Sequence, residues 1–296
     1  MTQKEREKLL KQATWAAIGA SGLLVAVKFY AWIYTGAVSM QATLVDSFLD
    51  VVASTINFFA VRHSLKPADH EHRFGHGKIE ALVGLAQAAF IAGSAVLIFL
   101  EAGRRLIQPV PLVHHMSGIW VILFSIAVTF LLVRYQSRIV KQTGSTAIHA
   151  DAVHYRSDLL INAGVLISLS LGQWLHIDRI DPVFGAVIAI YILWTILDIF
   201  KSSLDVLMDR ELPDAERERI AALVLSHPDI KGFHDLRTRS TGSQKFIQLH
   251  IEIDPNVLFQ EAYDVAHEVE ALIEAAYDDA EVIIHQDIPR TSTTTG

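Results

Sequence analysis

The sequence predicts an α-helical membrane protein in which six transmembrane helices precede a cytoplasmic α+β domain. Of the 296 residues, 51% are hydrophobic and only 19% are charged, whereas soluble domains carry about 25% charged residues. The apolar residues gather in long blocks before residue 206, and a tail with the composition of a soluble domain follows residue 210. We therefore expect a membrane domain over 1–210, a cytoplasmic α+β domain over 211–290 and a disordered tail over 291–296.

Six apolar segments are each long enough to cross a bilayer, which takes about 20 apolar residues in a helix. Charged residues, proline or glycine bound each segment. The first segment is too long for a cleaved signal peptide and lacks a small-residue cleavage site. The predicted spans are residues 13–34, 38–62, 79–103, 116–134, 147–174 and 183–204.

Basic residues in the loops predict the orientation of these spans. Lysine and arginine gather before the first span, between the second and third, and between the fourth and fifth. The opposite loops contain only Arg104, Arg105 and Arg179. Because lysine and arginine favour the cytoplasmic side, both termini are expected in the cytoplasm.

The tail shows helical and strand patterns in the order αββαβ. In the fourth quarter of the chain, Ile247, Leu249 and Ile251 alternate with polar residues, as a strand with one buried face requires. The order predicts a two-layer domain in which two helices cover one face of a sheet. The expected elements are a helix over 215–226, strands over 233–238 and 245–254 joined by a turn at 242–243, a helix that includes 262–276, and a strand over 282–287.

Charge and composition exclude several classes of function. Residues 211–296 contain 17 acidic and seven basic side chains, a net charge of −10 within a total of −7. An acidic tail does not suit nucleic acid, whose phosphates need a basic surface. It suits cations, although solubility alone would also explain it. The absence of cysteine excludes disulfides and thiolate zinc sites, so a metal would need the 14 histidines, carboxylates or other oxygen ligands.

Two pairs of ionisable residues interrupt the predicted membrane helices. Asp46 and Asp50 lie in the second span, and His154 and Asp158 lie in the fifth. The spacing of four residues places each pair on one helix face. Such groups are costly in a membrane unless paired or hydrated, and three carboxylates with one imidazole suit a tetrahedral Zn²⁺ site. The alternative is that they lie at helix ends or bond to other helices. Lys28 in the first span either extends its ammonium group to the membrane–water interface or pairs with one of these acids.

Two further groups outside the spans contain metal-ligand side chains. The loop after the second span contains Asp69, His72 and His76, which either bind a metal or belong to a solvated polar loop. In the tail, histidines and an aspartate lie on or near the polar faces of the expected strands. They either form a metal site or are ordinary surface residues that bind no metal. These tail residues are His234, His250, His285 and Asp287.

Together these motifs resemble the cation diffusion facilitator family, and within it a bacterial zinc-transporter branch. The likeness covers about residues 10–290 and rests on D-x-x-x-D in the second span, H-x-x-x-D in the fifth, and the segments DHEHRFGHGK, HDLRTR and IIHQD. The resemblance implies a homodimer in the bacterial inner membrane, with residues 211–290 as a ferredoxin-like, metallochaperone-like domain that binds metal and dimerises. The implied residues are Asp46, Asp50, His154 and Asp158 for the transport site; Asp69, His72 and His76 for the loop site; His234, His250, His285 and Asp287 for a metal cluster where two tails meet; and Lys78 with Asp209 for a charge interlock that holds the dimer.

One position departs from the family pattern. Tyr263 stands where relatives place a metal-binding histidine. A phenol is a poor zinc ligand at neutral pH because its ordinary pKa is about 10. His267, one turn further along the same helix face, is the candidate substitute. The sequence therefore leaves open whether the tail binds one metal ion or two.

The resemblance and the site chemistry together predict a carrier that exchanges metal for protons. Zn²⁺ is the expected substrate, with Cd²⁺ and Fe²⁺ as further ones, because the imidazole of His154 shifts the preference from harder ions toward zinc. Metal and H⁺ compete for the same groups, so export would use the proton gradient by alternating access. No Walker motif is present to bind nucleotide. Metal in the tail would bias the carrier's conformations.

Three rival functions remain. An intramembrane zinc hydrolase would need a catalytic base, and the H-E-x-x-H signature is absent, so no enzyme activity is expected. A cation channel would give flux without proton coupling. A membrane-anchored metal sensor would give no flux.

Overall fold

The computed structural model describes residues 3–35, 38–108, 116–175, 180–242, 244–277 and 279–289. It separates into two compact units, one of residues 6–204 and one of residues 205–296 together with residues 1–5. The tail expected to be disordered, 291–296, lies outside the described residues, as does position 243 of the expected turn.

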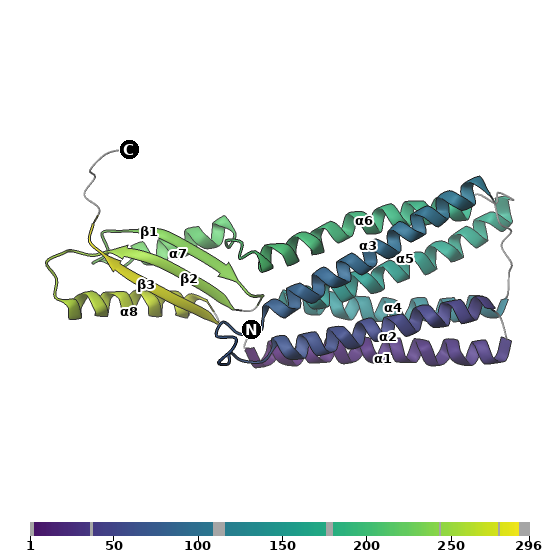
Figure 1. Cartoon of the computed structure of the whole chain (residues 1–296), viewed down its shortest axis with the longest axis horizontal. Coiled ribbons are helices and arrows are strands. Elements are labelled where there is room, and N and C mark those ends of the chain that lie inside the picture. Colours follow the sequence, from purple (N-terminus) through teal and green to yellow (C-terminus); the bar gives the residue numbers. More distant parts are fainter. Residues whose placement is uncertain are drawn as a thin grey trace. The chain divides into compact units, whose positions relative to one another are not determined.

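The first unit consists of six long helices that run side by side (Figure 1). Every predicted span is helical, and the helices extend beyond the spans. The fourth helix, for example, continues past residue 134 because arginine, glutamine and lysine there favour a helix without favouring lipid. The bounds are α1 Gln3–Thr35, α2 Val38–Ser64, α3 Lys78–Ile107, α4 Met116–Thr143, α5 Thr146–Leu175 and α6 Ile180–Leu207.

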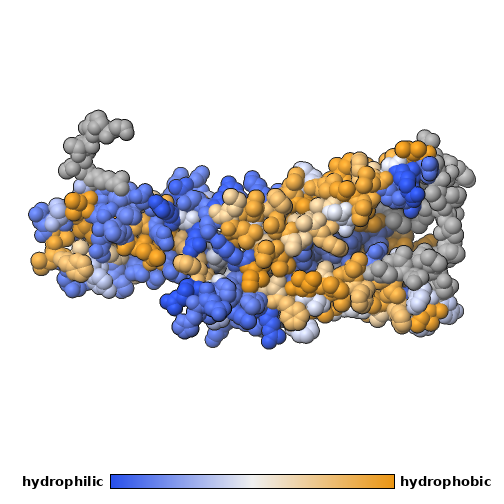
Figure 2. Space-filling view, viewed as in Figure 1, coloured by the Kyte–Doolittle hydropathy of each residue, from blue (hydrophilic) through white to orange (hydrophobic). Residues whose placement is uncertain are grey.

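The six helices differ in how apolar they are. Within the described residues, four of them are long and apolar enough to cross a membrane by themselves: α1, α3, α4 and α6. Leu97, Trp120 and Trp194 are largely exposed on α3, α4 and α6, and hydrophobic residues cover much of this unit in Figure 2. The other two, α2 and α5, carry the polar pairs. Their polar faces need neighbouring helices, because such groups are costly in lipid.

Helix α5 lies at the centre of this packing, in contact with α2, α3 and α4. Small side chains allow the close approach: Ala88 on α3 and Ala150 on α5 are almost fully buried in one apolar cluster with Ile192 of α6. Small residues at helix interfaces let backbones approach closely in membrane proteins. The face of α5 that carries Asp151 and His154 is therefore held between helices, whereas Arg156 of the same helix is exposed.

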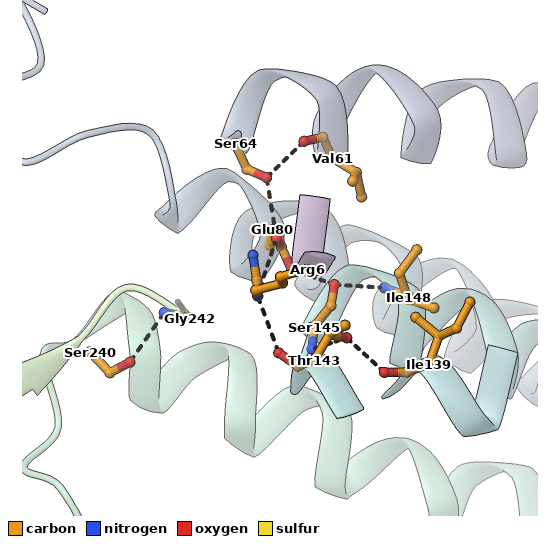
Figure 3. A network of polar contacts seen from close by, with 10 residues as sticks. All are labelled: Arg6, Val61, Ser64, Glu80, Ile139, Thr143, Ser145, Ile148, Ser240 and Gly242. Carbon is orange, nitrogen blue, oxygen red and sulfur yellow. Dashed lines mark hydrogen bonds and ion pairs between the residues drawn. The ribbon is translucent and has the colours of Figure 1, made fainter. Parts of the chain in front are cut away.

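A buried network of polar contacts joins the ends of the helices (Figure 3). Glu80 of α3 is only 4% exposed, and its carboxylate lies 3.4 Å from Nη2 of Arg6 of α1. The hydroxyl groups of Ser64 and Ser145 donate hydrogen bonds to the same carboxylate. Arg6 also donates through Nε to the carbonyl oxygen of Thr143. One carboxylate thus links α1, α2, α3 and the connection from α4 to α5.

The second unit has the expected order αββαβ. Its elements are α7 Asp214–Leu225, β1 Gly232–Ser240, β2 Lys245–Glu252, α8 Phe259–Ala276 and β3 Ala280–Asp287. The strands lie in the order β1-β2-β3, with β2 antiparallel to β1 and parallel to β3. Figure 1 shows α7 and α8 beside the sheet.

The core of this unit lies on one face of the sheet. Ile247, Leu249 and Ile251 of β2 are fully buried in one cluster with Ile220 of α7 and Val269 of α8. Because side chains alternate along a strand, the polar residues of β2 lie on the opposite face, which the two helices leave uncovered. That face carries the histidines described below.

Candidate metal-transport site and cytoplasmic metal cluster

The packing of α2 against α5 brings together three of the four predicted transport-site residues. One ligand atom from each of Asp50, His154 and Asp158 lies within 4.8 Å of the others. His154 Nε2 lies 3.1 Å from Asp50 Oδ1 and 3.7 Å from Asp158 Oδ2. The side chain of His154 is 11% exposed. Two carboxylates and one imidazole thus converge between α2 and α5, and each of the three side chains is at most 30% exposed.

The fourth predicted residue, Asp46, lies one turn earlier on α2. Its side chain is exposed, and it is not part of this group of three among the described residues. Lys28 of α1 reaches the same region of α2. Its ammonium group donates hydrogen bonds to Ser47 Oγ at 2.6 Å and to the carbonyl oxygen of Thr43 at 3.3 Å. Lys28 thus places a positive charge beside the acidic turns of α2.

Buried polar contacts next to this site were missed in the sequence. Asp151 is fully buried and accepts a hydrogen bond of 2.5 Å from Nε2 of Gln136 of α4. The hydroxyl groups of Ser54 of α2 and Tyr155 of α5 lie 2.6 Å apart. These contacts hold α5 against α2 and α4 and so orient His154. The spacing could have indicated Asp151, because it precedes His154 by three residues and therefore lies on the same face of the helix.

The loop after α2 brings Asp69, His72 and His76 together within 4.8 Å. Asp69 Oδ1 accepts backbone N–H groups from His72 at 2.7 Å and from Glu71 at 3.0 Å. These bonds lower the pKa of Asp69 below its usual range, and the bond from His72 has the largest effect. The carboxylate is therefore ionised at neutral pH. Gly75 has a φ of +75°, which only glycine adopts readily, and it turns the chain so that His76 faces Asp69 at 3.4 Å.

The sheet register aligns three histidines on neighbouring strands. His234 of β1 pairs with His250 of β2, which pairs with His285 of β3. Ring centroids lie 5.0 Å apart for the first pair and 4.6 Å apart for the second. Asp287 lies 2.8 Å from His250 Nδ1, 3.3 Å from His234 Nε2 and 3.2 Å from His285 Nε2. The hydrogen bond from His250 is the main cause that lowers the pKa of Asp287.

Other residues around this cytoplasmic cluster take different positions. Oε1 of Glu252 lies 3.8 Å from Nε2 of His234, although Glu252 is not among the site residues predicted from the sequence. Its position two residues after His250, on the polar face of β2, could have indicated it. His267 lies on the exposed side of α8, where it pairs with Glu270 at 3.2 Å and stacks on the ring of Tyr263. Neither His267 nor the predicted ligand His285 is part of the group formed by His234, His250 and Asp287 among the described residues.

The two residues of the implied interlock lie in different units. Lys78 is the first residue of α3. Asp209 follows α6 with a φ of +55°, and its Oδ1 lies 3.4 Å from Nη1 of Arg239.

Both units match models of one protein family. Residues 14–208 match the cation efflux transmembrane domain, and residues 212–288 match the cytoplasmic domain of cation efflux proteins. This chain belongs to the cation efflux family. It is the cation diffusion facilitator family that the motifs resembled, and it makes the chain a membrane transporter that exports divalent metal cations and is not an enzyme.

Similar proteins agree with this membership. The cation-efflux pumps FieF of Salmonella choleraesuis (strain SC-B67) and of Salmonella typhimurium (strain LT2) are each 44% identical over 280 residues, which is 95% of this cation efflux transporter and 93% of each relative. The solved structure of CzrB in its zinc form is 28% identical and covers 27% of this chain and 92% of its own. Its TM-score of 0.26 is too low to support a conclusion.

Proposed function

We propose that this cation efflux transporter is a proton-coupled antiporter that exports Zn²⁺ from the cytoplasm across the bacterial inner membrane, with Cd²⁺ and Fe²⁺ as further substrates. The observation that carries the proposal is the convergence of Asp50, His154 and Asp158 between α2 and α5. Nitrogen and carboxylate ligands in one tetrahedral group suit Zn²⁺. Asp46, one turn before Asp50, supplies the fourth ligand.

Proton coupling follows from the chemistry of the same atoms. Nε2 of His154 binds a metal only when it carries no proton, and the carboxylates bind a metal only when ionised. A cation and protons therefore exclude each other at one site. A site that opens alternately to the two sides exchanges one for the other, so protons entering from outside displace zinc that entered from the cytoplasm.

Zinc flux in sealed proteoliposomes under an imposed pH gradient tests this mechanism. We expect zinc to move against the direction of the proton gradient in the wild-type protein, and the coupled flux to disappear in Asp158→Ala. The readout is a zinc-sensitive dye inside the vesicles, with a pH dye in parallel.

Each rival predicts a different result in this assay. Zinc flux that does not respond to the pH gradient would support a channel and contradict antiport. A protein that binds zinc but moves none would support the membrane-anchored sensor.

The cytoplasmic domain supports a regulatory role in a homodimer. We propose that both termini lie in the cytoplasm and that Lys78 of one protomer pairs with Asp209 at the dimer interface. Zinc held by His234, His250, His285 and Asp287 would tighten the contact between two cytoplasmic domains. A ligand that binds one conformation better shifts the carrier toward it, so cytosolic zinc would raise the transport rate.

Removing His234 and His285 together tests this regulation. We expect the double alanine variant to need at least about five times more cytosolic zinc for half-maximal transport. A change of about fivefold is at the lower end of the affinity changes that allosteric ligands usually cause. The maximal rate should change less, because the transport site is intact. Glu274→Gln, an exposed position on α8, is the control. An unchanged dependence on cytosolic zinc in the double variant would contradict the role.

A further inference from the structure

A fourth potential ligand lies beside the loop site. His63 occupies the last turn of α2, directly before the loop. Its ring centroid lies 5.0 Å from that of His76, with the ring planes at 71°. The rings of His72 and His76 are 4.6 Å apart. Three imidazoles and the carboxylate of Asp69 thus gather at the junction between α2 and the loop.

The three residues grouped within 4.8 Å leave the loop site one ligand short of the usual zinc shell. Structural zinc sites are almost always tetrahedral with four protein ligands, whereas sites with three protein ligands keep an open position. His76 is buried and uses Nε2 toward Asp69. Its Nδ1 has no hydrogen-bond partner among the described residues. His72 approaches Asp69 from the other side through Nδ1 at 3.4 Å.

We propose that His63 is the fourth ligand and that the loop site is a closed Asp–His₃ zinc site. This inference rests on the loop residues Asp69, His72 and His76 binding metal, as the family resemblance implies. His63 is exposed, so its side chain can change rotamer to bring a ring nitrogen beside His72 and His76. The bound ion then ties the loop before α3 to the end of α2. Three imidazoles favour zinc over calcium or magnesium, which prefer oxygen ligands.

Zinc binding to the full-length protein tests this assignment in a background that leaves the loop site as the main metal site. Asp158→Ala with His234→Ala and His285→Ala provides that background. Zinc affinity is measured by equilibrium dialysis, and the number of bound imidazoles by X-ray absorption. We expect His63→Ala to weaken zinc binding at least about tenfold. Losing a group that only orients a metal ligand already costs about 10- to 100-fold in affinity, and a direct ligand should matter at least as much. The number of imidazoles should fall from three to two.

Two further variants separate the possible outcomes. His70→Ala changes another exposed histidine of the same loop, and its affinity should equal that of the background. His63→Cys supplies a thiolate ligand and should restore much of the affinity. If His72→Ala abolishes binding while His63→Ala leaves affinity and imidazole number unchanged, the assignment of His63 is wrong and the loop site stands. If the background protein itself binds no zinc, the loop site fails, and the role of His63 fails with it.

Discussion

Asp50→Asn is expected to reduce zinc transport at least about 100-fold at a fixed zinc concentration. Mutation of groups that only orient a metal ligand already costs about 10- to 100-fold in affinity or activity, and Asp50 lies directly against His154 at 3.1 Å. Asparagine keeps the shape of the side chain and removes its charge. Initial rates of zinc uptake into proteoliposomes, at equal protein density, measure the effect.

Glu101→Gln is the matched control for this substitution. It removes one negative charge from the same unit, at a place on α3 where Glu101 pairs with Arg104 and Arg105. We expect transport within about a factor of three of wild type, because surface ion pairs contribute little. Equal losses in Asp50→Asn and Glu101→Gln would show that charge alone explains the effect and would contradict a ligand role for Asp50.

Glu80→Ala is expected to lower the free energy of unfolding by about 3–5 kcal/mol, because it leaves the buried guanidinium of Arg6 without its partner. Both side chains are at most 10% exposed, so water replaces little of the lost interaction. The same change removes the acceptor of the hydroxyl groups of Ser64 and Ser145 (Figure 3). Thermal and denaturant unfolding of the purified protein, followed by tryptophan fluorescence, measures the loss.

Two comparisons isolate the buried charge. Glu7→Ala breaks the exposed pair of Glu7 with Lys11 on α1, and we expect a loss below about 1 kcal/mol. Replacing Arg6 and Glu80 together by methionine should recover most of the stability lost in Glu80→Ala, since no charge is then left buried alone. A loss in Glu80→Ala no larger than that in Glu7→Ala would rule out the proposed contribution of the network.

The length of apolar segments and the periodicity of hydrophobic residues predicted much of the fold. Long apolar segments indicated the six helices, and the alternation around Ile247 to Ile251 indicated a strand with one buried face. Helix ends were less predictable, because the residues after a span can continue the helix in water. The amphipathic pattern also placed the polar face of β2 on the side that the helices leave uncovered.

The sequence by itself determined which residues share a face of one element. A spacing of four in α2 and α5 places Asp50 near Asp46 and His154 near Asp158, because local geometry repeats with the helix. Only the tertiary structure decided which faces meet. It brings Asp50 to His154 across 104 positions of the chain, Gln136 to Asp151, and Arg6 to Glu80. It also leaves Asp46 outside the group of Asp50, His154 and Asp158, and it leaves His267, the candidate substitute for a family histidine, outside the group of His234, His250 and Asp287 among the described residues. The physical reason is that contacts between elements depend on how helices and strands pack, and spacing within one element carries no information about its neighbours.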